Sequence, residues 1–365
     1  MVRLLNGLRI VEVSAFIAAP YCGHTLAGLG AEVIRIDPPE GGLDFDRWPL
    51  SPQGGSLYFA GLNHLKRLET ADLRSDAGRE FVDRVITETK GGGIVLTNLS
   101  PKQLAFDRLK AIRTDVILVT LEGHRDGRTA VDYTVSAASG LPLLTGTEEK
   151  LGPINNPLPA WDLLAGLHMA VAILAAERLR SLTGEGAWIR LALADVMRAA
   201  MTTLGLVGEV QLGGQPRPAL GNHLYGTFGH DFVTRDGARV MLVAITGRQW
   251  TALGEVTGLA AEFAGIGQRL GLDLANTAGR YHAREDIRAA LDGWFAGRDF
   301  SELTAVFKGT AVCWEPYQTV SQLAGPGGGI LGNPIFSEVD HPGVGRVSTV
   351  GPVFELVGEE NNINR

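Results

Sequence analysis

The sequence predicts an α/β protein with a doubly wound parallel sheet in a large domain, accompanied by a smaller α+β domain. The first observation is that β-branched runs alternate with helix-length stretches as far as Thr120, which is the pattern of parallel βαβ units. The second is length, because 365 residues exceed what one ordinary hydrophobic core organises. The third is composition, since 45% hydrophobic and 20% charged residues are typical of a globular chain.

A strand, a helix and a second strand open the chain. Leu8 to Val13 (LRIVEV) and Ala31 to Ile36 (AEVIRI) are β-branched runs, and Pro20 to Gly30 between them has helix length, a first-turn proline and a terminal glycine. This spacing is that of a parallel βαβ unit, whose ligands bind at the carboxyl ends of the strands. Further strands are expected at Gly93 to Thr97, Asp115 to Thr120 and Trp188 to Leu193, with helices over Ser75 to Thr89, Ser100 to Arg113 and onward from Asp195.

A long apolar helix is expected after two prolines, Pro157 and Pro159, which hold the approach extended. The 14 residues from Leu163 to Ala176 carry no charge, so the helix should be buried nearly all round. Asp162 stands where an N-cap stands. It is either a plain cap, which contributes about 1 kcal/mol, or a carboxylate held ionised by the helix N-terminus and available as a nucleophile. The residue types alone favour the plain cap.

The large domain is expected to span residues 1–215 and the small domain residues 219–320, with residues 330–365 returning to the large domain. Pro216 to Pro218 and the glycine-rich Gly325 to Gly329 mark the two connections. Two connections mean that the small domain is inserted into the large one.

The small domain should contain a hairpin and a group of helices. Antiparallel strands are expected within Gly221 to Ala244, turned at Arg235-Asp236-Gly237, and helices across Arg248 to Phe307. The apolar spacing of these helices indicates their buried faces. The expected core anchors are Trp250, Leu253, Ile287, Leu291 and Trp294.

Charge and cysteine content exclude several classes of function. A net charge of −7 without a Lys/Arg run argues against a nucleic-acid partner. Cys22 and Cys313 are far apart in sequence and are expected to be free thiols in a reducing cytoplasm. No uncharged apolar run reaches the roughly 18 residues of a membrane helix, and the scattered histidines indicate no metal site. We therefore expect a cytoplasmic protein that does not enter a membrane.

The motifs for nucleotide binding are incomplete. The first βα turn, Ser14 to Pro20, contains no glycine, so it fails the GxGxxG requirement for close approach to a pyrophosphate. Asp37 imitates the ribose-binding acid of NAD proteins, which leaves an NAD-dependent oxidoreductase as a weak alternative. Gly61 to Arg67, an expected loop with two cations, and Thr97 to Lys102, at a strand's carboxyl end, suit contacts with phosphate.

Taken in order, these stretches resemble the class III CoA-transferases. The opening LRIVEVSAFIAAPYCGHTLAGLGAEVIRID resembles the family's first βαβ unit, LNHLKRLETADL its L-N-x-x-K-R-S loop, and TNLSP its E-N-F-x-P segment. ERLRSLTGEGAWIRLALADV resembles the stretch after the family's catalytic helix. GNHLYGTFGHDFVTRDG and ITGRQWTALGEVTGL resemble the opening of its small domain. The resemblance is collinear from about Leu8 to Pro352 and is therefore more specific than any single motif.

The resemblance implies a fold, a nucleophile and a substrate class. Family members interlock two ring-like chains into a homodimer, each chain with a Rossmann-like large domain and a small domain. Asp162 matches the family's nucleophilic aspartate, which reverses the preference for a plain cap. The substrate would be an acyl-CoA thioester, with no tightly bound cofactor and no metal. Relatives usually run some tens of residues further, so the C-terminus at Arg365 is expected to be short.

Five stretches resemble a particular branch of the family, in which CoA moves between the C1 and C4 carboxyls of one mesaconyl group. This intramolecular transfer would use an aspartyl mixed anhydride and an aspartyl-CoA thioester. The family's racemases place a histidine before an aspartate where this chain has Val131-Asp132, so a racemase is disfavoured. An intermolecular transferase with a separate carboxylate acceptor and a non-catalytic CoA-binding protein stay open as alternatives. The five stretches are SAFIAAP, GGLDFDRWP, HRDGRTAVDYTV, PAWDLLAG and GNHLYGTFGHDF.

Two groups of side chains are expected to bind the substrate. In an acidic protein the cations that hold the CoA phosphates must gather locally, and a cation or hydroxyl should hold the second carboxylate of the acyl group. The residues expected to contact CoA are Ile17, Ala18, Arg35, Leu62, Asn63, Lys66, Asn98, Leu99 and Arg108. The candidates for the acyl carboxylate are His124, Arg125, Tyr225 and Arg248.

Overall fold

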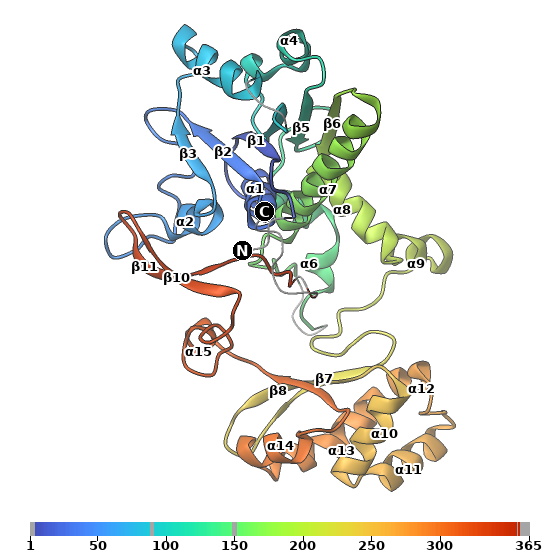
Figure 1. The fold of residues 1–365 in the computed structure, drawn as a ribbon. Helices are drawn as coiled ribbons and strands as arrows, with labels where there is room; N and C mark the ends of the chain where they lie inside the picture. The colour runs from blue at the N-terminus through green and yellow to red at the C-terminus, as the bar shows by residue number, and fades with distance from the viewer. Residues whose placement is uncertain (1–3, 88–90, 148–151, 356, 358–365) are drawn as a thin grey trace. The chain divides into compact units, whose positions relative to one another are not determined.

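A computed structural model describes residues 4–87, 91–147, 152–355 and 357 of the protein (Figure 1). Helices and strands are numbered in chain order as Figure 1 labels them. The predicted short C-terminus lies outside the described residues, since 356 and 358–365 are not among them.

The chain divides into two compact units. The first comprises residues 1–140, 155–216 and 330–365, and the second comprises residues 141–154 and 217–329. Residues 141–154 were predicted to belong to the large domain, and their place in the second unit corrects that prediction. Thr147 forms an antiparallel bridge with Leu220, and this pairing ties the stretch to the start of the second unit.

The first unit is built on a parallel sheet. Its described part has six strands in the order β3-β2-β1-β4-β5-β6, and all neighbours are parallel. The order reverses between β1 and β4, which is the topological switch point of a doubly wound fold. The predicted α/β fold with a parallel sheet is confirmed. The strands are β1 (Arg9–Val13), β2 (Glu32–Asp37), β3 (Arg67–Thr70), β4 (Ile94–Thr97), β5 (Ile117–Glu122) and β6 (Ala187–Ala192).

Strand β3 was missed in the sequence, which predicts a loop through Arg67. In the structure Arg67 begins β3 and pairs with Ile34 of β2. Arg67, Leu68 and Thr70 are exposed in this edge strand. A strand without a buried face lacks the apolar alternation that predicts strands from sequence.

The two faces of the sheet are covered by different helices. Val11, Val13 and Ile36 point to the face covered by α3 and α4, with which they form one hydrophobic core. Side chains alternate along a strand, so Glu12 and Arg35 point to the opposite face, where α1 and α7 pack together. The helices of this unit are α1 (Ala18–Gly28), α2 (Leu57–Asn63), α3 (Asp76–Thr87), the 3-10 turn Lys102–Leu104, α4 (Phe106–Ile112), α5 (Asp132–Ala138), α7 (Ala160–Thr183), α8 (Leu193–Thr203) and α9 (Leu206–Gly213). The return segment adds an antiparallel hairpin of β10 (Phe336–His341) and β11 (Gly345–Val350).

The second unit combines a small antiparallel sheet with helices. The predicted hairpin is present, and Gly237 has a positive φ of 86° at the turn between β7 and β8. The core anchors predicted from sequence are confirmed, because they lie in or pack against one apolar cluster. The strands β7 (Phe228–Val233), β8 (Arg239–Ala244) and β9 (Cys313–Pro316) accompany α6 (Leu141–Leu144), α10 (Gly247–Thr257), α11 (Ala260–Leu270), α12 (Thr277–His282), α13 (Arg284–Ala296), α14 (Phe300–Phe307) and α15 (Val320–Ala324).

Helix α7 is less buried than its sequence suggests. Its inner face packs on α1, where a Cβ added to Gly166 would lie 2.6 Å from the Ala18 carbonyl oxygen. On other parts of its surface Leu167, Val171 and Leu182 are exposed, so the expectation of burial nearly all round is wrong for the single chain. Within the described residues, α7 alone is long and apolar enough to cross a membrane, by length and composition only. Core helices pass the same test, and the contact with α1 accounts for the apolar inner face.

Candidate active site

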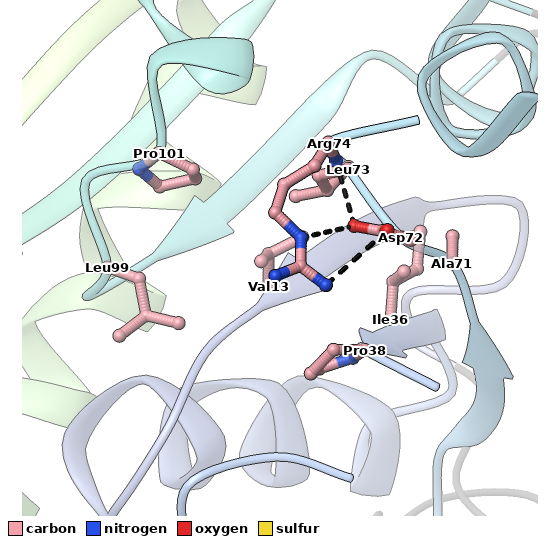
Figure 2. A pocket seen from close by; sticks show the side chains of 9 residues that line it. All are labelled: Val13, Ile36, Pro38, Ala71, Asp72, Leu73, Arg74, Leu99 and Pro101. Atoms are coloured by element: carbon pink, nitrogen blue, oxygen red, sulfur yellow. Dashed lines mark hydrogen bonds and ion pairs between the residues drawn. The ribbon is translucent and has the colours of Figure 1, made fainter. Parts of the chain in front are cut away.

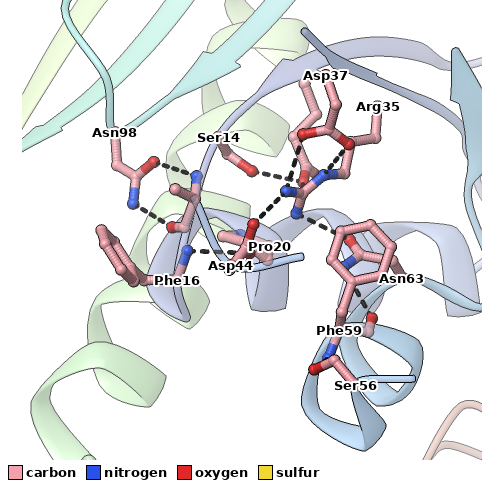
Figure 3. A network of polar contacts seen from close by, with 12 residues as sticks. Ser14, Phe16, Pro20, Arg35, Asp37, Asp44, Ser56, Phe59, Asn63 and Asn98 are labelled. Atoms are coloured by element: carbon pink, nitrogen blue, oxygen red, sulfur yellow. Dashed lines mark hydrogen bonds and ion pairs between the residues drawn. The ribbon is translucent and has the colours of Figure 1, made fainter. Parts of the chain in front are cut away.

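One side chain joins the carboxyl ends of β1 and β4 at the switch point. The Asn98 amide donates from Nδ2 to the Ala15 carbonyl oxygen (2.6 Å) and accepts at Oδ1 from the Ala15 N–H (2.9 Å), as Figure 3 shows. Ile17 and Ala18 follow where α1 begins, and both are buried. Asn98 thus shapes the first βα loop at the edge where doubly wound folds bind their ligands.

Helix α7 begins before Asp162. Its N-cap is Pro159 and Asp162 is its third residue, so Asp162 does not cap it. The cap comes from Asp132 of α5, whose Oδ2 accepts from the backbone N–H groups of Trp161 (2.7 Å) and Asp162 (3.0 Å). The interpretation of Asp162 as a plain cap is therefore wrong. A carboxylate from another helix satisfies the amides of the first turn, which leaves the Asp162 side chain free of that role.

The Asp162 carboxyl is strongly perturbed. Burial raises its pKa most, the negative charge of Asp132 raises it further, and the positive charge of Arg47 lowers it, giving a pKa of about 7. Burial also raises the pKa of Asp132, against the effect of its two backbone hydrogen bonds. Perturbed carboxyls of this kind gather at functional sites. The arrangement favours an aspartate that is ionised above neutral pH and more basic than an ordinary carboxylate.

Asp162 lies on the side of α7 that meets α1. Residues four apart on a helix share a face, and Gly166, four residues after Asp162, packs on Ala18 and Cys22 of α1. Helix α1 starts directly after the first βα loop. The structure thus brings the predicted nucleophile and the predicted ligand-binding loop together.

Arg47 and Tyr58, neither of which was predicted to have a role, lie beside this loop. The guanidinium carbon of Arg47 lies 5.5 Å from the ring centroid of Phe16 and 5.0 Å from that of Tyr58. Burial raises the pKa of Tyr58, Arg47 lowers it, and the charge of Asp162 raises it further. The stretch GGLDFDRWP contains Arg47 and was singled out for its resemblance, but that resemblance could not separate a binding arginine from a rim residue.

Arg35 is the centre of a buried polar network (Figure 3). Its side chain is 0% exposed and donates from Nε and Nη2 to Asp37 (2.9 and 3.0 Å), from Nη2 to Asp44 (2.7 Å) and from Nη1 to Asn63 (3.2 Å). A guanidinium committed in this way cannot reach a phosphate in solvent. The prediction that Arg35 contacts CoA is therefore corrected. The same holds for Asn63, because it is buried and its Oδ1 accepts hydrogen bonds from Arg35 and Lys66.

Lys66 belongs to the same network. Its Nζ donates to Glu12 Oε1 (2.8 Å), to Asn63 Oδ1 (2.9 Å) and to the Pro20 carbonyl oxygen (2.8 Å). Ser14 also donates to Glu12 Oε1, at 2.7 Å. Burial lowers the pKa of Lys66, and the charge of Glu12 opposes this. Lys66 was expected to hold a CoA phosphate, and the structure corrects that expectation because all three ammonium donors are used inside the protein.

A cavity of about 240 Å³ opens at the carboxyl ends of β1 to β4 (Figure 2). Its walls are mostly apolar, and Leu99, which was expected to contact CoA, is among them. Arg74 supplies a cation with an exposed side chain, oriented by Asp72 through an Nε to Oδ1 hydrogen bond of 2.8 Å. Arg74 was not among the predicted cations, because it lies directly after LNHLKRLETADL, the stretch in which Lys66 and Arg67 were identified. The lining residues are Val13, Ile36, Pro38, Ala71, Asp72, Leu73, Arg74, Leu99 and Pro101.

The remaining predicted CoA contacts lie on helices of the first unit. Leu62 is half-buried in α2. Arg108 is on α4, and its Nη1 donates to Asp83 Oδ1 at 2.9 Å and to the Gln103 carbonyl oxygen at 2.9 Å. These contacts tie Arg108 to its neighbours but leave its side chain partly exposed. A role for Leu62 or Arg108 in CoA binding stays a prediction.

The residues expected at the acyl carboxylate are divided between the units. His124 and Arg125 lie in the turn after β5, where Arg125 pairs with Asp195. Tyr225 and Arg248 belong to the second unit. Arg248 is the second residue of α10 and lines a cavity of about 490 Å³ within that unit.

Comparison with known proteins is consistent with this geometry. The family model described as CoA-transferase family III matches residues 5–365. The 2-methylfumaryl-CoA isomerase of Chloroflexus aurantiacus is 45% identical over 349 residues, covering 94% of this chain and 85% of that protein. The succinyl-CoA:mesaconate CoA-transferase of Haloarcula marismortui is 26% identical over 95% of this chain and 88% of its own length. The crystal structure of a CaiB/BaiF family protein from Brucella suis has a TM-score of 0.75 at 25% identity, covering 98% of this chain and 93% of that one. The chain belongs to CoA-transferase family III.

Proposed function

We propose that the protein is an intramolecular CoA transferase that exchanges the C1 and C4 thioesters of mesaconyl-CoA, the substrate class of its 45% identical relative. One observation carries the proposal. The Asp162 carboxylate stands in the first turn of α7, beside the switch point of the sheet, with a pKa raised to about 7. A carboxylate is a weak nucleophile, so such a site must supply positioning and exclusion of water.

The reaction proceeds by two acyl exchanges at Asp162 and their reversal. The carboxylate attacks the thioester carbonyl, which gives an aspartyl–mesaconyl anhydride and releases the CoA thiolate. The thiolate attacks the aspartyl carbonyl, which gives an aspartyl-CoA thioester and free mesaconate. The other carboxylate of mesaconate then attacks this thioester, and the thiolate that leaves attacks the mesaconyl carbonyl of the new anhydride. The isomeric thioester forms and Asp162 is regenerated with no net change of proton count.

The surroundings of Asp162 favour its acylation. Above about pH 7 the side chain carries a negative charge that burial and the Asp132 carboxylate both disfavour. Formation of the anhydride or the thioester makes Asp162 neutral and removes this repulsion. The same influences make the ionised group more basic than an ordinary carboxylate, and basicity raises nucleophilicity.

The cavity at the carboxyl ends of β1 to β4 is suited to the nucleotide end of CoA. Its apolar walls fit a flat heterocycle, and the exposed guanidinium of Arg74 fits a phosphate. Leu99 lines this cavity and directly follows Asn98, whose side chain is hydrogen-bonded to Ala15 of the first βα loop. The pantetheine arm would run along this loop toward Asp162. CoA enters as part of the substrate, and no tightly bound cofactor is invoked.

A second copy of the chain is proposed to cover the exposed side of α7. The apolar Leu167, Val171 and Leu182 are exposed along it, and Val171 is 66% exposed. In the described residues α9 has no buried side chain at all. Exposed apolar surface of this extent on a soluble domain indicates an interface. Light scattering after size exclusion should give a homodimer, and Val171→Glu should shift it toward monomer.

A mixing experiment tests the intramolecular reaction. Unlabelled C1 mesaconyl-CoA is converted in the presence of excess isotopically labelled mesaconate, and the product thioester is analysed by mass spectrometry. The proposal expects formation of the C4 isomer without label. Label in the product would mean that the acid exchanges with solution, and the enzyme would then be an intermolecular transferase. Absence of isomerisation together with retained CoA thioester binding would favour a non-catalytic CoA-binding protein.

A further inference from the structure

Mesaconate has two carboxylates, and while one is bonded to sulfur or to Asp162 the other remains an anion. We propose that Arg47 and Tyr58 hold this second carboxylate and thereby select a dicarboxylic acyl group. The inference rests on the proposed function and deepens it. It assigns the role for which His124, Arg125, Tyr225 and Arg248 were the candidates from sequence.

Arg47 has the features of a cation that is available to bind an anionic ligand. Its guanidinium is held by the aromatic rings of Phe16 and Tyr58, at 5.5 and 5.0 Å. Its side chain makes no hydrogen bond or ion pair with any residue that the structure describes, and the residue is exposed. Stacking fixes the plane of a guanidinium without using its N–H groups. The planar fork is therefore oriented in advance for a carboxylate.

Tyr58 offers a second donor at the same place. Its hydroxyl oxygen is buried and has no hydrogen-bond partner in the described part of the chain. A buried hydroxyl without a partner is unfavourable by itself, and an incoming acceptor relieves that cost. Because burial and the nearby Asp162 raise its pKa, the hydroxyl stays protonated and can donate at neutral and moderately alkaline pH.

Arg47 lies near Asp162 without pairing with it. The positive charge of Arg47 acts on Asp162, yet no ion pair within 4.0 Å joins the two described side chains. The trans carbon skeleton of mesaconate places its carboxyl carbons about 3.8 Å apart, as in a trans peptide unit of similar bond lengths. One carboxyl can therefore be bonded to Asp162 while the other meets Arg47 and Tyr58.

Binding by Arg47 and Tyr58 also explains how mesaconate can reverse its orientation without dissociating from the enzyme. When the aspartyl-CoA thioester forms, mesaconate is released from Asp162 as a dianion, and one of its carboxylates is still bound at Arg47. Exchange of the two carboxylates at this arginine presents the other end to the thioester. The two ends are chemically alike apart from the neighbouring methyl group, so one cation serves both halves of the reaction.

Binding measurements in an Asp162→Asn background test the inference without turnover. Titration calorimetry compares C1 mesaconyl-CoA with crotonyl-CoA, which lacks the second carboxylate. The parent should bind mesaconyl-CoA at least about tenfold more tightly, as expected for a charge-assisted hydrogen-bonded pair. Added Arg47→Gln should remove this preference. Added Tyr58→Phe should reduce it severalfold, and this change removes a hydroxyl that has no partner in the described fold.

Arg84→Gln is the matched control. Arg84 is also an exposed arginine over an aromatic ring, 5.5 Å from the Phe81 centroid, but it lies on α3 at the other face of the sheet. It should leave the preference unchanged. A preference that survives Arg47→Gln would overturn the inference and leave the proposed function standing. If the Asp162→Asn parent shows no preference for mesaconyl-CoA, the inference falls together with the dicarboxylate substrate.

Discussion

The Asp132 carboxylate has two separable effects on Asp162, the proposed nucleophile. It accepts hydrogen bonds from two backbone N–H groups of α7, and its charge raises the pKa of Asp162. Asp132→Asn retains an oxygen acceptor for the helix and removes the charge. The proposed mechanism requires ionised Asp162, so activity should fall as pH decreases through about 7 in the wild type. In Asp132→Asn this acid limb should lie at lower pH.

The size of the displacement follows from the geometry. Asp132 Oδ2 is 3.0 Å from the Asp162 amide nitrogen, and the Asp162 carboxylate oxygens lie at most about 5 Å from that nitrogen by bond lengths. The two charges are therefore within about 8 Å, where they repel by about 2 kcal/mol at an effective dielectric constant of 20. This repulsion corresponds to about 1.5 pH units. Solvent reaches part of Asp162, so we expect the limb to move by about one pH unit.

The assay is the pH dependence of kcat/KM for isomerisation, which reports ionisation in the free enzyme. Burial is the larger cause of the raised pKa, so the limb should remain above the pH of an ordinary aspartate. Asp132→Ala is the control, because it removes the charge and the cap and should also lower the free energy of unfolding by about 1 kcal/mol. An acid limb that stays at the wild-type position in Asp132→Asn would refute the electrostatic coupling of these two carboxylates.

Three further substitutions test other parts of the structure. Asp162→Asn should abolish turnover. Because the pKa of Asp162 is raised in the folded state, the free energy of unfolding of the wild type should fall as pH rises from about 4 to about 7. In denaturant unfolding the variant should therefore be more stable than the wild type by on the order of 2 kcal/mol at pH 8 and equally stable at pH 4. Arg74→Gln should raise KM for the CoA thioester about tenfold with kcat retained, in steady-state kinetics; an unchanged KM would place the nucleotide elsewhere. Lys66→Met should lower the free energy of unfolding by about 3–5 kcal/mol, because Glu12 loses its buried partner; a normal melting temperature with a raised KM would instead restore Lys66 as a phosphate ligand.

The alternation of strands and helices could be predicted from the sequence because it depends on local patterns of apolar residues. The β-branched strands β1, β2, β4 and β5 are buried on both faces, and near-continuous apolar runs indicate such strands. Strand β3 is an edge strand with mostly exposed side chains and carries no such pattern. The position of the helix that carries Asp162 was predicted, but its cap was not, because Asp132 reaches it from 30 residues earlier in the chain.

The roles of the cations could not be predicted, because burial depends on partners that are distant in sequence. Arg35 resembles a surface arginine at the end of a strand until the register pairs β2 with β1 and sets it beside Glu12. Lys66 meets Glu12 across 54 residues. Arg47 presents the converse case, because its proposed role depends on a guanidinium that makes no hydrogen bond or ion pair with the described residues, and no sequence pattern marks such an unused group.

The buried charges assigned from sequence to the substrate serve the site indirectly. Asp44 accepts from Arg35 Nη2 through Oδ1 (2.7 Å) and from the Phe16 N–H through Oδ2 (3.1 Å). Phe16 has a positive φ of 65°, which is uncommon for a non-glycine residue, and this hydrogen bond helps to hold it there. Arg47 follows Asp44 by three residues, donates its own backbone N–H to the Asp44 carbonyl oxygen (3.2 Å), and stacks on Phe16. The network therefore fixes the loop of Arg47 to the first βα loop. The buried Arg35 thus helps to hold in place the exposed Arg47, which we propose to bind the substrate.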